Sequence, residues 1–272
     1  MIAGNHDHGS NVSAQIAYTK ISPRWHFPNF FYTKVLKLPG TSKTVQLVML
    51  DTTMLCCRNQ LKKLRKFSSQ RQQLTWIKDT LRSSTADFLI VAGHHPVFSA
   101  GSHGNTRYLE TKLKPLLEEN NVTVYLSGHD HSLQHFKENN SIVNYFVSGA
   151  GGGNFHRRSH WNKEHHKIVS TKIKFFNGYY GAFTLFEATP EFLKITQINE
   201  NGKELYKAQL RPRNSRTVVA FDFIKPKTQP KLTPSVKPTL KPKTQPKLTP
   251  KSKPTIKPVL VPRGISNLWG RL

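Results

Sequence analysis

Three short motifs that join glycine to histidine constrain the fold of this chain most strongly, because each comes just after an apolar run. The motifs are Gly4-Asn5-His6-Asp7-His8, Gly93-His94-His95-Pro96 and Gly128-His129-Asp130-His131, which follow residues 1–3, 88–92 and 122–126. Runs of β-branched, aliphatic and aromatic residues bounded by glycine predict buried strands. Ligand sites in α/β sheets form in loops beyond the carboxyl ends of strands, so we expect these motifs to carry the chemistry.

The predicted strands and helices alternate in the first half of the chain, which indicates an α/β fold. Helices are predicted where leucine and isoleucine recur at helical spacing, over 70–82 and 108–119. Further strands are predicted over 45–50, 145–147, 183–186 and 193–198. No helix is predicted after residue 140, which favours a second, more antiparallel sheet. The expected architecture is two packed sheets with flanking helices.

The composition changes abruptly from Lys225, and a basic tail over 217–272 is predicted to follow a globular domain over 1–216. Within the tail, residues 225–240 recur as a near copy at 241–256, giving a 16-residue repeat rich in Lys, Pro and Thr. Proline every few residues, without any acidic side chain, prevents helix and sheet ladders and favours extended polyproline II conformations. We therefore expect residues 217–272 to be disordered.

The formal net charge of +26 indicates an anionic partner or surface. Nucleic acid, acidic matrix, membrane surface and phosphoester are all compatible with charge alone. No base-reading module with interleaved aromatic residues is visible, so sequence-specific nucleic-acid recognition is not expected. The charge supports only one kind of partner, which is acidic matrix or another polyanion attracted to the basic tail without sequence specificity.

Targeting signals are sparse in the sequence as given. No signal peptide opens it, and no apolar run is long enough to predict a membrane span. Asn11, Asn121 and Asn139 begin Asn-x-Ser/Thr sequons, which predict glycosylation sites if the protein is secreted. The two cysteines, Cys56 and Cys57, are neighbours, and neighbouring cysteines rarely bridge because disulfide geometry requires separated, facing Cβ atoms.

The residue types in the three motifs point to metal binding. His129 and His131 stand two positions apart, so both side chains can point the same way from an extended segment. Neutral imidazole binds zinc, iron and related ions, and the Asn carbonyl oxygen is a harder donor that borderline metals accept. Asn5, His94 and His129 are therefore predicted to complete most of one metal site.

Four segments carry a resemblance to a known family. They are Gly-Asn-His-Asp at 4–7, Asn-Val-Ser-Ala-Gln-Ile-Ala-Tyr at 11–18, Ile-Ser-x-Arg-Trp-x-Phe-Pro at 21–28 and Val-Ala-Gly-His at 91–94. Together they resemble the calcineurin-like metallophosphoesterase superfamily and, within it, the tartrate-resistant (purple) acid phosphatase type 5 family. The likeness covers about residues 1–213. It implies an α/β (α+β) sandwich of two mixed sheets flanked by helices.

The resemblance also implies a role for each motif residue. Asn5, His94 and His129 would hold a divalent metal, His131 would belong to a ferric site, and His6 and His103 would contact phosphate and assist the leaving group. The implied cofactor is Fe³⁺ paired with Fe²⁺ or Zn²⁺. The implied activity is acid phosphatase: metal-bound hydroxide attacks phosphate monoesters, either small molecules or phosphoproteins.

The chain departs from the family pattern at its start and at position 108, and also over 58–72, a basic loop where the family carries acidic residues. The family carries an Asp, a bridging Asp and a Tyr before its Gly-Asn-His-Asp segment, where this chain begins, so the first βαβ portion is expected to be missing. The family also ties position 56 to a cysteine where this chain has Tyr108, so that bridge is not expected.

Two functions therefore stay open at the level of sequence. One is a phosphatase that is secreted or lysosomal, and monomeric when complete, as the resemblance implies. The alternative is a catalytically incomplete fragment that acts, if at all, as a polyanion-binding protein through its basic tail.

Overall fold

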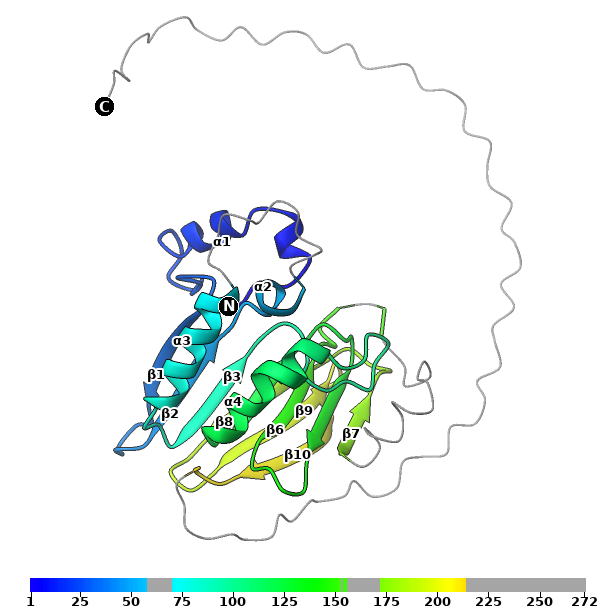
Figure 1. The fold of residues 1–272 in the computed structure, drawn as a ribbon. Coiled ribbons are helices and arrows are strands. Elements are labelled where there is room, and N and C mark those ends of the chain that lie inside the picture. The colour runs from blue at the N-terminus through cyan, green and yellow to red at the C-terminus, as the bar shows by residue number, and fades with distance from the viewer. Residues whose placement is uncertain (58–69, 153, 156–171, 214–272) are drawn as a thin grey trace, which may run out of the picture. The chain divides into compact units, whose positions relative to one another are not determined.

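Seven strands form the larger of two sheets in the computed structural model, which describes residues 1–57, 70–152, 154–155 and 172–213 (Figure 1). Their spatial order is β1 (Tyr32–Lys37), β2 (Thr44–Met49), β3 (Phe88–Ala92), β4 (Val124–Ser127), β6 (Asn144–Ser148), β5 (Leu133–Lys137) and β7 (Ile173–Asn177). Strands β2, β3, β4 and β6 are parallel, while β1 and β5 run against them. All five residues of β3 are buried, as a central parallel strand covered on both faces requires.

Three antiparallel strands form the smaller sheet, in the order β10 (Glu204–Leu210), β9 (Leu193–Asn199) and β8 (Ala182–Ala188). The two sheets share one apolar core, in which Phe88 and Ile90 of β3 pack with Leu193 and Ile195 of β9. The predicted sandwich of two sheets is therefore confirmed. The smaller sheet is purely antiparallel over the residues described, because β8, β9 and β10 follow one another through short turns.

Helices cover the opposite face of the larger sheet. Ile77 and Leu81 of α3 (Gln70–Arg82) and Leu117 of α4 (Lys114–Glu119) are buried against it, in a cluster that includes Val91 and Tyr125. The layers are therefore helices, the larger sheet and the smaller sheet (Figure 1). The bounds of α3 agree with the helix predicted over 70–82, because its apolar spacing matches one buried face.

The helix predicted over 108–119 is divided into two pieces. A π-helical turn, η3 (Leu109–Leu113), precedes α4, and Pro115 stands in the first turn of α4. Proline has no backbone N–H, so it cannot make the hydrogen bond that would continue a regular α-helix across the junction. Leu109 and Leu113 are still buried, so the apolar face predicted from the sequence is kept.

The sequence did not reveal strands β1, β5, β7 and β10, the helices α1 (Val12–Tyr18) and α2 (Thr52–Cys56), or the short turn η1 (Asp7–Gly9). It also predicted a strand over residues 1–3, which is wrong, since no strand pairs with that segment in the described structure. Instead the amino group of Met1 donates to the carbonyl of His26 and to the hydroxyl of Tyr32, both at 2.8 Å. Ala3 packs with Val12 and Phe27 in a small separate core.

The basic tail over 217–272, its repeats at 225–240 and 241–256, and the boundary at residue 216 lie outside the described residues. Their organisation therefore stays a prediction. Across the described part of the chain, every helix is too short or too polar to cross a bilayer.

Candidate metal centre

Two of the histidine motifs meet at the carboxyl ends of β3 and β4, which are parallel neighbours paired at Ala92 and Leu126. Backbone hydrogen bonds join the two loops beyond the strands. Gly93 N–H donates to the Leu126 carbonyl and Gly128 N–H donates to the His94 carbonyl, both at 3.0 Å. His94 and His129 are thereby placed next to each other, with ring centroids 5.0 Å apart.

The third motif comes to the same place from the N-terminal segment. Its turn is held by Asp7, whose carboxylate accepts from Gly4 N–H at 2.8 Å and from Gln15 Nε2 at 2.9 Å. Gly4 lies so close to His94 that a Cβ at this position would be 2.8 Å from the imidazole atoms Cε1 and Nδ1. A glycine is therefore required for Asn5 to reach His94.

The donor atoms of Asn5, His94 and His129 converge. His94 Nε2 lies 2.7 Å from Asn5 Oδ1 and 3.1 Å from His129 Nδ1. Ligands of one four- to six-coordinate ion with bonds of about 2.0–2.1 Å lie roughly 2.8–3.4 Å apart. The three side chains therefore fit a single divalent cation with only small movements. One oxygen and two nitrogens suit zinc or iron.

Burial keeps the imidazole of His94, and that of its neighbour His95 outside the centre, neutral. It lowers the pKa of His94 to about 4, and the nearby His6 and His131 lower it further, while Asp7 and Asp51 act in the opposite direction. Burial likewise lowers the pKa of His95 to about 3. A metal ligand must be deprotonated, so both imidazoles are in the binding form at neutral pH.

The remaining predicted site residues surround this centre. The exposed His103 stacks its ring on His129, with centroids 4.2 Å apart. His131 is half-buried, and its Nδ1 lies 3.0 Å from the carbonyl oxygen of Asn154. His6 is exposed at the start of η1. The structure thus brings Asn5, His94 and His129 into direct contact, while the other three lie around them.

Asp130 is a residue to which the sequence gave no role, although it stands inside the third motif. Its fully buried carboxylate accepts from the Ser99 hydroxyl and from His103 N–H, the latter at 3.1 Å. A Cβ at Gly101 would come within 2.5 Å of this carboxylate, so the loop needs glycine there. Asp130 therefore ties the His103 loop to β4. No pattern in the sequence marked this role. His129 has φ 66°, so residues 129–131 are not the extended segment that the sequence predicted, and strand alternation does not apply to them.

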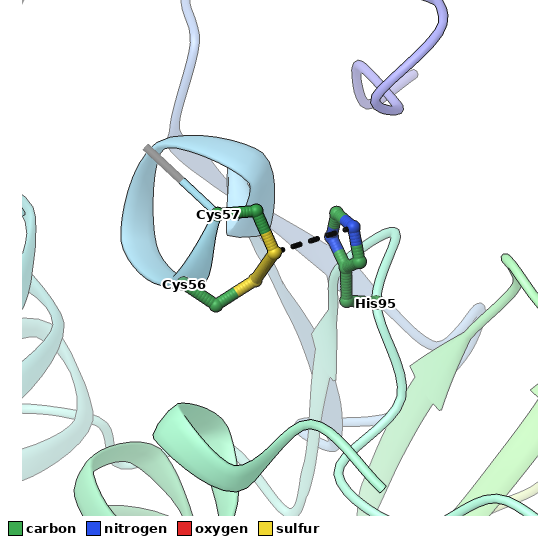
Figure 2. Close-up of side chains that lie close together, drawn as sticks. All are labelled: Cys56, Cys57 and His95. Carbon is green, nitrogen blue, oxygen red and sulfur yellow. Dashed lines mark hydrogen bonds between the residues drawn. A yellow bond between two sulfur atoms is a disulfide. The ribbon is translucent and has the colours of Figure 1, made fainter. Parts of the chain in front are cut away.

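The disulfide between Cys56 and Cys57 corrects the expectation that these neighbours do not bridge (Figure 2). Helix α2 ends at Cys56, and Cys57 leaves the helical conformation with φ −120° and ψ 27°. The backbone thus changes direction at Cys57, the second cysteine of the disulfide. Cys56 and Tyr108 both pack against the core cluster beneath the helices. Because residue 108 is a tyrosine, it cannot form a disulfide with Cys56 in place of Cys57.

The three sequon asparagines, Asn11, Asn121 and Asn139, are all exposed. Asn11 also caps α1, because its Oδ1 accepts from Ala14 N–H at 3.1 Å. Exposure is what a glycosylation site requires, and whether these asparagines carry glycans stays a prediction.

Comparison with known proteins places the chain among phosphatases. The calcineurin-like phosphoesterase family matches residues 1–133. Tartrate-resistant acid phosphatase type 5 of Mus musculus is 43% identical over 79% of this chain and 67% of its own length, and the Homo sapiens enzyme is 41% identical with the same coverage. Purple acid phosphatase 4 of Arabidopsis thaliana is 30% identical over 76% of this chain and 60% of its own length. The chain spans about two thirds of the length of the mammalian relatives.

Two solved structures share the fold. GAP50, described as the anchor in the inner membrane complex of Plasmodium, matches with a TM-score of 0.65 and 20% identity, over 79% of this chain and 66% of its own. Purple acid phosphatase PPD1 of Lupinus luteus seeds matches with a TM-score of 0.50 and 15% identity, over 67% of this chain and 32% of its own. At these identities the likeness supports the two-sheet fold alone.

Proposed function

Because this chain belongs to the tartrate-resistant (purple) acid phosphatase family of calcineurin-like phosphoesterases, we propose that it hydrolyses phosphate monoesters at a metal centre built on Asn5, His94 and His129. The observation that carries the proposal is the position of His94 Nε2, 2.7 Å from Asn5 Oδ1 and 3.1 Å from His129 Nδ1. Side chains from three separate loops meet at one point. Loop histidines that only contact solvent would have no reason to meet in this way.

Each residue contributes in a way that follows from its surroundings. A bound divalent cation would polarise the phosphate oxygens and activate the attacking water. His94 and His129 offer imidazole nitrogens that burial and the neighbouring loops orient, and Asn5 adds a carbonyl oxygen. His103 stacks on His129 and is exposed, so it can protonate the departing oxygen of an ester bound in front of the centre. We assign His6 to the phosphate, as the family resemblance implies, and its side chain is exposed at the start of η1.

His131 is the residue that we assign to a second, ferric position. The Asn154 carbonyl at 3.0 Å from its Nδ1 fixes the ring, as the outer hydrogen bond of a metal-binding histidine does, so Nε2 is the proposed donor. The family resemblance supports Fe³⁺ there, with Fe²⁺ or Zn²⁺ at the Asn5 position. We also propose that the protein is secreted or lysosomal, which the three exposed sequons support, and that it is a monomer, as the family resemblance implies. The alternative role in polyanion binding has no support among the described residues, because the tail lies outside them.

Hydrolysis of a small aryl phosphate by the full chain tests the proposal. The chain is loaded with iron and zinc and assayed at mildly acidic pH, beside His94→Ala and the matched control His26→Ala, whose side chain is exposed and outside the centre. We expect turnover in the wild type and the control. In His94→Ala we expect kcat to fall at least about 100-fold, because loss of one group that stabilises transition-state charge has an effect of that size. No turnover in the loaded wild type, or equal turnover in His94→Ala, contradicts the proposal.

A further inference from the structure

A second group of metal-binding side chains lies at the end of α2, beside the proposed metal centre. The sulfurs of Cys56 and Cys57 and one ring nitrogen of His95 all lie within 4.8 Å of one another. Cys57 Sγ is 3.6 Å from His95 Nε2, and Figure 2 shows the imidazole directed at the sulfur. These are the only two cysteines of the chain.

His95 is held in place through both its backbone and its ring. Its N–H donates to Thr52 Oγ1 at 2.8 Å, and its carbonyl accepts from the Tyr125 hydroxyl at 2.7 Å. Its Nδ1 lies 3.1 Å from the same Thr52 Oγ1, whose two lone pairs can accept from both His95 groups. An outer hydrogen bond of this kind fixes the tautomer and the ring orientation of a metal-binding histidine. A disulfide sulfur carries no hydrogen, so with the disulfide intact Nε2 donates to Cys57 Sγ and Nδ1 accepts from the Thr52 hydroxyl. In the other tautomer Nδ1–H donates to Thr52 Oγ1, and Nε2 then offers its lone pair to a cation.

The spacing of the nitrogen and the sulfur matches that of two ligands on one ion. With Zn–S of about 2.3 Å, Zn–N of about 2.0 Å and tetrahedral angles, the two ligand atoms lie roughly 3.5 Å apart. Cys57 Sγ and His95 Nε2 are 3.6 Å apart. Only the two sulfurs must move to create the site, by separating from bonding distance to about 3.8 Å, as tetrahedral ligands do. Rotation of the Cys56 and Cys57 side chains provides this movement once the bond is broken.

We propose that reduction of the Cys56–Cys57 disulfide creates a binding site for one soft or borderline divalent cation, with two thiolates and His95 Nε2 as its protein ligands. In the reduction, a small thiol reductant supplies two electrons and two protons, and its own two thiols join as a disulfide. In the binding step, the cation displaces the two thiol protons to solvent. Thiolates favour zinc and cadmium over the hard cations. Water supplies the remaining position.

This site is distinct from the centre of Asn5, His94 and His129, although the two are adjacent. His95 is the connection, because its ring centroid lies 4.5 Å from that of His129 and 4.9 Å from that of His94. The inference does not rest on phosphatase activity. Thiolate ligands give spectroscopic signals that imidazole and amide ligands do not, so the two sites can be measured separately in the same chain.

Titration of the full chain with Cd²⁺ tests the proposal. One sample keeps the disulfide, and a second sample is reduced by a trialkylphosphine. In that reaction the phosphine becomes the phosphine oxide, with water as the source of the oxygen. The reductant is then removed from the second sample under an inert atmosphere. The ultraviolet charge-transfer band from thiolate to cadmium reports only on Cys56 and Cys57. We expect a band that is absent from the oxidised chain and that saturates, after subtraction of the Cd²⁺ bound by the oxidised chain, at one Cd²⁺ per reduced chain.

Variants identify the ligands. Cys57→Ser should lose at least half of the band, and His95→Gln should keep the band but bind Cd²⁺ at least about 10-fold more weakly. His26→Gln, at an exposed position outside the cluster, is the matched control and should titrate like the wild type. Absence of the band in the reduced chain overturns the proposal, as does saturation at half an equivalent, which indicates a site shared by two chains. Equal affinity of His95→Gln and wild type overturns it too.

His95 is buried, so the fold of His95→Gln is checked first by circular dichroism. If that variant does not fold, X-ray absorption at the cadmium edge of the reduced wild-type chain gives the answer directly. Two sulfur ligands together with imidazole scattering support the site. Sulfur and oxygen ligands without imidazole contradict it.

Discussion

Nε2 of His94 lies 2.7 Å from Oδ1 of Asn5, although 89 residues separate the two in the chain. The contact joins the turn after residue 3 to the loop after β3, and His129 reaches the same nitrogen from the loop after β4. Sheet pairing alone explains the meeting of His94 and His129. The approach of Asn5 depends in addition on the absence of a side chain at Gly4.

Replacing Gly4 therefore tests how the third loop reaches the centre. Gly4→Ala places a Cβ 2.8 Å from the His94 ring, so Asn5 or His94 must shift. We expect affinity for Zn²⁺, measured by titration calorimetry, to fall about 10-fold or more. Gly9→Ala is the matched control, because its Cβ would meet no atom within 4 Å. Equal affinity in the two variants would show that Asn5 takes no part in binding.

Asp130 is expected to contribute to stability through buried hydrogen bonds. Asp130→Ala leaves the Ser99 hydroxyl and the His103 N–H without their acceptor, which costs about 2–4 kcal/mol in the free energy of unfolding. Urea unfolding measures this difference. Asp79→Ala, at an exposed position of α3, should change stability by no more than about 0.5 kcal/mol. A small effect at Asp130 would remove its proposed role in holding the His103 loop.

The pH dependence of stability should carry the signature of His135. This buried side chain lies 2.7 Å from the Tyr206 hydroxyl and 3.1 Å from Asn144 Oδ1, and burial lowers its pKa to about 3. Below about pH 6.5 His135 is protonated in the unfolded chain but stays neutral in the folded chain. The free energy of unfolding therefore falls as the pH drops from 6.5 towards 3. Above pH 6.5 this contribution is complete.

His135→Gln is the corresponding variant. Urea unfolding should show lower stability than wild type at pH 7.5, because the Tyr206 and Asn144 contacts are impaired. Between pH 6 and pH 4 the slope of stability against pH should be shallower than in wild type, by up to about 1.4 kcal/mol per pH unit, which is one proton. Parallel curves for the two proteins would contradict the assignment.

Arg213, the last residue that the structure describes, fixes this end of the chain to the rest of the domain through hydrogen bonds. Its guanidinium donates to the carbonyls of Ala86 and Asn120, at 2.6 and 3.2 Å, and to the Ser84 carbonyl. Arg213→Ala should lower the free energy of unfolding by about 2–3 kcal/mol, as loss of charge-assisted hydrogen bonds does. Arg211→Ala, which removes an exposed arginine two residues earlier, should have little effect. If both variants unfold at the same urea concentration as wild type, Arg213 does not anchor this end.

The sequence predicts the fold best where burial is uniform. Strand β3 is recognisable because all five of its residues are apolar and buried. Strand β5 is equally buried but contains Gln134, His135 and Lys137, so periodicity gives no sign of it. Its polar side chains are stabilised by partners far away in sequence, such as Tyr206 for His135. Such pairings become visible only in three dimensions.

The candidate site shows the same division. Position after an apolar run was enough to select His94 and His129, because parallel strands deliver their following loops to one edge of the sheet. The buried role of Asp130 depends on Ser99 and His103, in a loop about 30 residues away. His95 was visible in its motif, but its contact with Cys57 depends on where α2 ends. Spacing along the chain cannot provide either relationship.

Anomalous diffraction from a crystal of the full chain soaked in Zn²⁺ tests the central claim most directly. The account predicts a zinc peak about 2.0–2.2 Å from Asn5 Oδ1, His94 Nε2 and His129 Nδ1 together. A map with no peak there, or with the three side chains turned away from a common point, would contradict it.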